Sequence, residues 1–122
     1  MDIVVVASQV IIAVGLLNVW LLRTDKATEW RGGDARSMRE EFAAYGLPAW
    51  SMWVVGSLKV FFAILLIVGI WVTPVVQPAA IGIAILMVGA IVMHFKVGDP
   101  PKKSLPAFAI LVLCLIVIFF SA

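Results

Sequence analysis

The sequence contains one cysteine, one histidine and few charged residues, and each scarcity excludes a class of protein. A single cysteine, Cys114, rules out an internal disulfide framework and any metal site built from several cysteines. With one histidine, a zinc site or a bis-histidine haem would lack ligands. The nine basic residues form no dense run and are mixed with seven acids, so no binding to nucleic acid is expected.

The shortage of charge is matched by an excess of apolar residues. Hydrophobic residues make up 64% of the 122-residue chain and charged residues 13%, against about 45–50% and about 25% in ordinary soluble domains. A domain of this size has too little interior to hide so much apolar surface from water. The first residues carry an acid where a secretory signal carries basic residues. The sequence therefore predicts an integral membrane protein with a retained first helix.

Four apolar stretches set the expected architecture. Each approaches the about 20 residues that a helix needs to cross about 30 Å of hydrocarbon, and none shows the alternation of barrel strands. The prediction is an all-α integral membrane four-helix bundle that forms a single domain over residues 1–122. The expected spans are about 3–22, 50–71, 77–95 and 104–121.

Basic residues are concentrated in two of the three connections between these spans. The first connection, 23–49, and the third, 96–103, hold eight of the nine basic residues. The positive-inside rule then places both connections in the cytoplasm of a bacterial cell and both termini outside its inner membrane. Four tryptophans lie near expected span ends, where indoles prefer the interface: Trp20, Trp50, Trp53 and Trp71.

The first connection is expected to contain a short amphipathic helix over about residues 35–45. Asp34 is its expected N-cap, and Gly46 with Pro48 marks its end. One apolar stripe at helical spacing consists of Ala35, Met38, Phe42 and Tyr45. Other residues are expected to face elsewhere: Arg36, Arg39, Glu40 and Glu41. The helix would lie on the cytoplasmic interface or cover the bundle, and a solvated linker is the alternative.

Lys59 is the only formally charged residue inside the spans. It lies about eleven residues after Pro48, or about 16 Å along a helix, which places it near the middle of the membrane. A charged lysine there costs at least about 2.5–3.5 kcal/mol, so it should face the bundle interior with a partner or lose its charge. The candidate partners are the loop acids Asp34, Glu40 and Glu41, the amides of Gln9 and Asn18, helix carbonyls, or an anionic or quinone-like ligand. A snorkelling or structurally hydrogen-bonded lysine is an equal alternative.

A ligand pocket is the hypothesis that unites the remaining polar residues. His94 lies near the cytoplasmic end of the third span, two residues before Lys96, and Asn18 lies at a similar depth on the first span. The candidate ligand-binding residues are Lys59, His94, Asn18, Gln9 and Lys96, and the candidate residues of the interfacial loop are Asp34, Arg39, Glu40, Glu41 and Tyr45. For His94 a structural hydrogen bond is the alternative.

Several segments resemble the DoxX-like family of small four-helix bacterial membrane proteins. They are EFAAYGLPAW followed by VGSLKVFFAILLIVGIW, a proline-rich turn, and AIGIAILMVGAIVMHFKVGD. They are similar to the family's YG-hydrophobic-P start, its G-x-x-K/E-x-x-x-A-x-x-L-L-x-G second helix and a third helix ending in A-x-x-x-H-x-x-x-G-D. The resemblance covers roughly residues 40–105. It implies an accessory or assembly role, as in quinone-linked oxidoreductases or membrane redox-defence complexes.

Three functions follow as hypotheses. The first is a non-catalytic subunit that binds a quinone, lipid or other hydrophobic ligand, contacts membrane lipids and joins a homo-oligomer or membrane complex. No cofactor besides such a bound quinone or lipid is expected. The second is a small homodimeric transporter of an anionic or amphipathic molecule, since an embedded lysine disfavours export of cations. The third, an enzyme acting on a lipidic substrate with Lys59 or His94 as acid or base, is the weakest.

Overall fold

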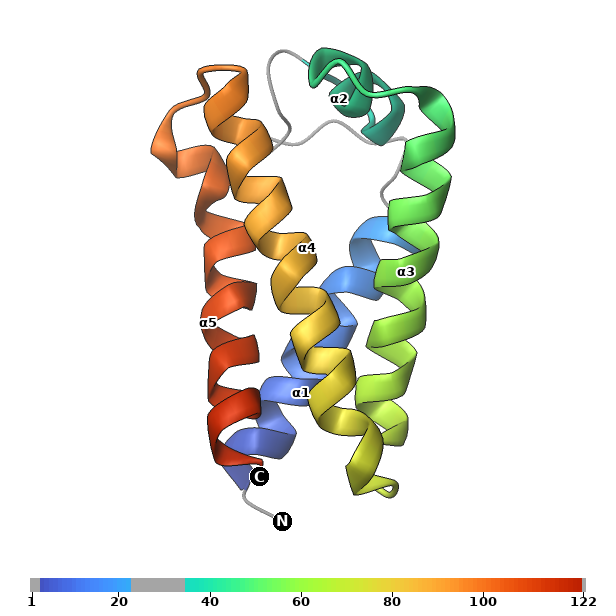
Figure 1. The fold of residues 1–122 in the computed structure, drawn as a ribbon, viewed down its shortest axis with the longest axis vertical. Coiled ribbons are helices and arrows are strands. Elements are labelled where there is room, and N and C mark those ends of the chain that lie inside the picture. The colour runs from blue at the N-terminus through green and yellow to red at the C-terminus, as the bar shows by residue number, and fades with distance from the viewer. Residues whose placement is uncertain (1–2, 23–34, 122) are drawn as a thin grey trace.

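The structure, a computed structural model, describes residues 3–22 and 35–121. Four helices are long and apolar enough to cross a membrane, as predicted, and the described residues contain no strand. The helices α1 (Ile3–Leu17), α3 (Ala49–Val68), α4 (Val76–Lys96) and α5 (Leu105–Phe120) run up and down in turn (Figure 1). Both termini lie at the same end, opposite the short helix α2 (Met38–Ala44), which covers the other end (Figure 1).

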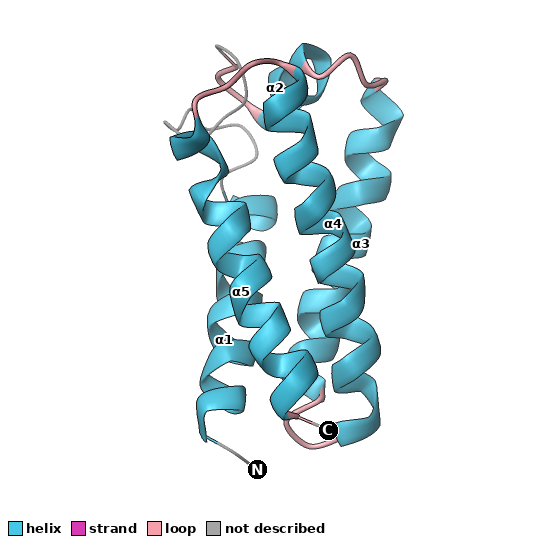
Figure 2. Ribbon diagram, turned by 60° about the vertical axis from the view of Figure 1, so that its left-hand side comes forward, coloured by secondary structure: helices cyan, strands magenta, loops and turns pink. Residues whose placement is uncertain are grey.

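Short segments join the long helices at the two ends of the bundle (Figure 2). A π-helical segment, η1 (Asn18–Leu22), continues α1 toward the α2 end. The 3-10 turns η2 (Thr73–Val75) and η3 (Pro101–Ser104) precede α4 and α5, and both contain the prolines that fit the first turn of a helix.

The core lies along the bundle axis, where all four long helices contribute fully buried side chains. Ile12, Leu66, Ile83 and Val117 are each 0% exposed and come from α1, α3, α4 and α5 in that order. A second cluster, Met38, Phe42 and Met52, fixes α2 to α3. The outward faces are also apolar, as expected for helices whose solvent is lipid.

Two glutamines, the buried Gln9 and the part-buried Gln77, join the helices at the end where the termini lie. Gln9 Nε2 on α1 donates to Leu66 O at 2.9 Å, and Gln77 Nε2 on α4 donates to Ile118 O at 2.7 Å. Both carbonyls belong to the last turn of their helix, where intrahelical donors run out. In hydrocarbon such carbonyls need a protein donor, so these two amides serve the fold.

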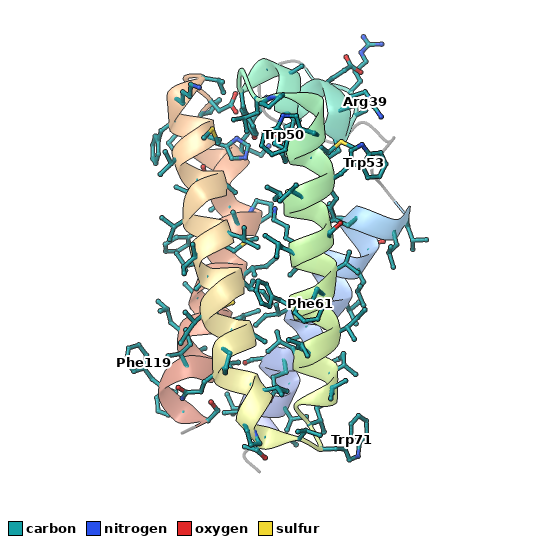
Figure 3. All side chains as sticks on the ribbon, turned by 45° about the vertical axis from the view of Figure 1, so that its right-hand side comes forward. Arg39, Trp50, Trp53, Phe61, Trp71 and Phe119 are labelled. Carbon is teal, nitrogen blue, oxygen red and sulfur yellow. The ribbon has the colours of Figure 1, made fainter. Side chains whose placement is uncertain are left out.

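Tryptophans occupy both ends of the bundle, with one exception to the predicted pattern. Trp50 and Trp53 are exposed near the α2 end and Trp71 at the opposite end (Figure 3). Trp20 is instead turned inward, toward α3, and lies against Gly56. The indole fits there because Gly56 has no side chain: a Cβ at that position would be 2.5 Å from the Trp20 ring.

Glycines allow close packing of the helices at some positions and not at others. A Cβ on Gly82 of α4 would lie 2.6 Å from Cε2 of Phe62 on α3, so this glycine brings α3 and α4 together. A Cβ on Gly15 or Gly89 would meet no atom within 4 Å. Helix packing therefore explains Gly82 but not Gly89.

Replacing Gly82 with alanine is expected to destabilise the bundle by about 1–3 kcal/mol, because the Phe62 ring has to move out of a packed position. The control Gly15→Ala has space for its methyl group and gains helix propensity, so it is expected to be neutral or stabilising by up to about 1 kcal/mol. Unfolding in mixed micelles measures both. Equal free energies of unfolding for the two variants would show that the close contact between Gly82 and Phe62 does not contribute to the stability of the bundle.

Candidate functional site

A cavity of about 700 Å³ lies beneath α2, enclosed by α2 and by residues of η1 and the four long helices. Most of its wall is apolar, from residues such as Leu16, Val55 and Met87. Seven of the lining residues have nitrogen or oxygen atoms in their side chains: Asn18, Trp20, Glu41, Tyr45, Lys59, His94 and Lys103. Its volume lies within the range of about 300–1,000 Å³ typical of sites for small molecules.

The cavity exists because α3 and α4 separate beyond their contact at Gly82 and Phe62. Figure 1 shows these two helices farther apart at the α2 end than at the middle of the bundle. The helix α2 lies over the gap, and its buried residues Met38 and Phe42 form part of the cavity wall. Of the stripe predicted for this helix, Met38, Phe42 and Tyr45 are buried, whereas Ala35 lies before the helix and is half-buried.

Lys59 lies near the middle of α3 and is half-buried in the cavity wall. Its Nζ is 5.3 Å from the centre of a Trp20 ring, which is a cation–π distance. Over residues 3–22 and 35–121, Lys59 makes no hydrogen bond or ion pair. The ammonium group therefore faces the cavity with an aromatic neighbour but without an acceptor for its hydrogens.

Trp20 is a site residue that sequence reasoning assigned to the membrane interface. The π-helical turn η1 widens the end of the first span, and π-turns are frequent at functional sites. The Trp20 ring lies edge-on to Phe42 of α2, with centroids 6.2 Å apart. Gly56, one helical turn before Lys59, was the signal in the sequence: a residue without a side chain beside a lysine leaves room for a large ring.

His94, near the end of α4, is held by a carboxylate from the following loop. His94 Nδ1 is 2.7 Å from Asp99 Oδ2, and both side chains are buried. Asp99 also lies 3.8 Å from Lys103 Nζ. Because Nδ1 is bonded to Asp99, Nε2 is the ring nitrogen left to face a ligand.

Gly98 brings Asp99 back to His94. The glycine has a φ of 73°, in the left-handed region that favours glycine. Gly98 N then donates to Phe95 O at 3.1 Å, and Asp99 N donates to His94 O at 3.0 Å. This pair of bonds is the Schellman ending of a helix. A glycine four residues after His94 and an aspartate directly after that glycine therefore place the carboxylate beside the imidazole.

Glu41 faces the cavity, which differs from the sequence prediction that it faces elsewhere. The side chain is buried, and Glu41 Oε1 accepts a hydrogen bond of 2.6 Å from the Tyr45 hydroxyl, one helical turn further along α2. The Tyr45 ring in turn lies edge-on to His94, with centroids 5.9 Å apart. A carboxylate next to the apolar stripe turns inward here because the tyrosine supplies a donor.

Lys96 holds α2 over the cavity but does not line it. Lys96 Nζ donates to Tyr45 O at 2.8 Å, at the C-terminal end of α2. The last carbonyls of a helix lack intrahelical partners, and a cation there also interacts favourably with the helix dipole. Gly46, with a φ of 77°, lets the chain turn at this point. Lys96 is therefore placed as a positioning residue for α2.

The helix α2 begins later than predicted. Ser37 is its N-cap and accepts a hydrogen bond of 3.2 Å from Glu40 N, so the helix spans Met38–Ala44 rather than about 35–45. Ser37 and Glu40 have the spacing of a capping box, which favours a helix start at this position over an earlier one. Asp34, the predicted N-cap, lies outside the described residues.

The other predicted residues are distributed as follows. Asn18, Lys59 and His94 are brought together around the cavity, with Glu41 and Tyr45. Gln9 lies in the core at the opposite end of the bundle and bonds to Leu66 O. Arg39 and Glu40 are exposed on α2, and Figure 3 shows Arg39 pointing away from the bundle. That the first group binds a ligand stays a prediction.

Three polar groups at the cavity have unused hydrogen-bonding capacity: the Asn18 amide, Lys59 Nζ and His94 Nε2. In the described parts of the chain none of these groups has a hydrogen-bonding protein partner. The same residues contain no cluster of three or more His, Cys, Asp or Glu that could hold a metal. The arrangement offers both donors and acceptors to a polar head group inside an apolar enclosure.

Comparison with known proteins gives one finding. The sequence model of the DoxX-like family matches residues 31–118, well over half of the chain. The matched range includes α2, α3 and α4 with Lys59, His94, Gly98 and Asp99. No curated protein and no solved structure matches the chain.

Replacing Lys96 with methionine is expected to loosen α2. The bond from a charged donor to Tyr45 O is worth about 1.5–3 kcal/mol, so amide exchange in α2 should rise about tenfold or more. The control Arg39→Met removes an exposed cation from α2 itself and should leave exchange unchanged. Hydrogen–deuterium exchange measures both, and unchanged exchange in Lys96→Met would show that another contact holds α2.

Proposed function

We propose, from the premise that the chain belongs to the DoxX-like family, that it is a non-catalytic inner-membrane protein that binds a quinone, lipid or other hydrophobic ligand beneath α2. In this proposal it acts as an accessory or assembly subunit of a membrane redox complex. The cavity is the binding site, and Lys59, His94 and Asn18 contact the polar part of the ligand.

The observation that carries this proposal is the set of unpaired polar groups in an otherwise apolar enclosure. Leaving a buried donor or acceptor without a partner costs about 1–3 kcal/mol, and more for a charged group. Buried Glu41 and part-buried Gln77 have partners, whereas the buried Gln9 Oε1 and Ser121 Oγ, which lie outside the cavity, have none in the described residues. The cavity differs from these isolated atoms because three such groups meet there. A ligand with a polar head and an apolar body would supply the missing partners and fill the cavity.

Binding without catalysis fits the side chains that line the cavity. Within the described part of the chain, its lining includes no serine, threonine or cysteine as a nucleophile. The three unpaired groups come from different elements, η1, α3 and α4, and none is hydrogen-bonded to another. His94 is fixed by Asp99, which suits it to orient a ligand.

The proposed orientation places α2 on the cytoplasmic side and both termini outside. The described basic residues outside the spans gather at the α2 end: Arg36, Arg39, Lys96, Lys102 and Lys103. The α3–α4 connection, at the opposite end, carries none. Under the positive-inside rule this asymmetry favours the proposed orientation in the inner membrane.

Lys59 also favours a second candidate function, a small homodimeric transporter of an anionic or amphipathic molecule. An ammonium group near the middle of a membrane helix, facing a cavity, would attract a negatively charged solute and repel a cation. In that case the ligand would leave the cavity on the other side of the membrane. A subunit that only binds its ligand would release it to the same side.

Native mass spectrometry of the protein, extracted gently from its own membrane, tests the first candidate. We expect a bound quinone or lipid, or a stoichiometric partner chain, and we expect the small molecule to be lost from the triple variant Asn18→Leu, Lys59→Met, His94→Leu. The control Gln9→Leu removes a buried polar group outside the cavity and should keep the ligand. A ligand retained by the triple variant would contradict the assignment of the site. A ligand-free homodimer in the wild type would favour the transporter.

A further inference from the structure

We propose that the ligand is an acidic amphiphile, an anionic oxygen on an acyl chain, and that it enters sideways from the hydrocarbon between α3 and α4 to place that oxygen at Lys59. This inference rests on the proposed function, because it names the ligand class and the route for the same cavity. It is carried by two features of the described residues: an opening in the cavity wall toward lipid, and an ammonium group that makes no hydrogen bond or ion pair.

The cavity wall is open on the side between α3 and α4. Ile85 and Gly89, one turn apart on α4, line the cavity and are also exposed on the outer surface, Ile85 by 67%. A residue that belongs to both surfaces marks an opening, and Pro106, in the first turn of α5, marks another one at the end of the bundle. Across from them on α3, Val55 and Lys59 line the cavity. We call the gap framed by Val55, Lys59, Ile85 and Gly89 the lateral opening.

The lateral opening has defined limits along the bundle. Toward the termini it ends where Gly82 packs against Phe62. Toward the other end it is covered by α2, which is fixed to α3 through Phe42 and Met52. Gly89 lies between these limits, with no atom within 4 Å of the place of a Cβ. Because Gly89 has no side chain, it leaves the lateral opening unobstructed, and it makes no close contact between helices.

The depth of the opening selects an apolar route. Lys59 is near the middle of α3, and Ile85 and Gly89 are in the central part of α4, so hydrocarbon rather than water lies outside the opening. A water-soluble anion would have to cross lipid to reach it. An acyl chain already dissolved in the bilayer would pass with its apolar part against Val55, Ile85 and Met93.

The charge at the inner end of the route selects an anion. Lys59 Nζ faces the Trp20 ring, which attracts a cation but accepts no conventional hydrogen bond. The Glu41 carboxylate lines the same cavity and its charge acts on Lys59, but it is bonded to the Tyr45 hydroxyl and is not in ion-pair contact with Lys59. An anionic oxygen of the ligand would accept from the ammonium directly, and charge-assisted bonds of this kind are the strong ones.

The test measures retention of three radiolabelled probes with the same chain by the full-length protein in phosphatidylcholine nanodiscs: octadecanoic acid, octadecyl phosphate and octadecan-1-ol. The two acids should be retained about tenfold or more over the alcohol, from the bond to a charged group. Lys59→Met should reduce both acids to the level of the alcohol. Lys59→Arg keeps the charge and should keep the preference. The preferred acid distinguishes a carboxylate from a phosphate ligand.

The route is tested with Gly89→Phe, which should lower retention of all three probes about tenfold or more by closing the opening. Its control is Gly15→Phe, at a helix glycine that also has open space but lies outside the cavity. A mid-chain diazirine on the preferred acid should label Val55, Ile85 or Gly89. Labels on α1 or α5 alone, or full retention by Gly89→Phe, would overturn the lateral route.

Failure of this inference differs from failure of the proposed function. Equal retention of acids and alcohol, with Lys59→Met unchanged, would overturn the anionic ligand and leave a neutral ligand such as a quinone in the cavity. No retention of any probe would overturn the acyl-chain ligand. The proposed function itself would fail only if native mass spectrometry also found no small molecule or partner chain.

Discussion

Hydrocarbon offers no hydrogen bonds, and this constraint accounts for the placement of most polar groups in the bundle. Gln9 and Gln77 donate to carbonyls in the last turns of α3 and α5, and Lys96 donates to a carbonyl at the end of α2. His94 Nδ1 pairs with Asp99. Each of these bonds satisfies a helix end or a buried side chain. The pairs also join elements distant in the sequence, so the same bonds hold the fold.

The unpaired groups at the cavity differ both from these bonded groups and from the two isolated buried oxygens without a partner, Gln9 Oε1 and Ser121 Oγ. Lys59 Nζ, the Asn18 amide and His94 Nε2 converge from three elements on one space, and in the described residues no protein atom completes their bonding. The space results from α3 and α4 parting above Gly82 and from α2 covering the gap. A bundle built only for stability would close such a space with larger side chains, for example at Gly89. The structure is consistent in every part with a site for a molecule that carries its own polar head.

The sequence predicted the four spans and the buried stripe of α2, because length and helical periodicity are local properties. It also indicated that Asn18 and His94 lie at a similar depth and suggested a pocket that they share with Lys59. The inward orientation of the Trp20 ring could not be predicted, because it depends on the π-helical turn η1 and on Gly56, which faces the ring from α3. The inward turn of Glu41 depends on one bond from Tyr45. The amide of Gln9 is a group that could also bind a ligand, and only the tertiary structure shows that it bonds to a carbonyl at the end of α3 and lies away from the cavity.

The central claim is that the cavity beneath α2 holds a ligand whose polar end meets Lys59. An experimental density map of the protein, purified with its native lipids and resolved well enough to trace side chains, tests it most directly. The account predicts elongated density that belongs to no protein residue, with one end at Lys59 Nζ and the other passing Gly89 between α3 and α4. A cavity filled by rearranged side chains, with Lys59 paired to a protein carboxylate, would contradict the account.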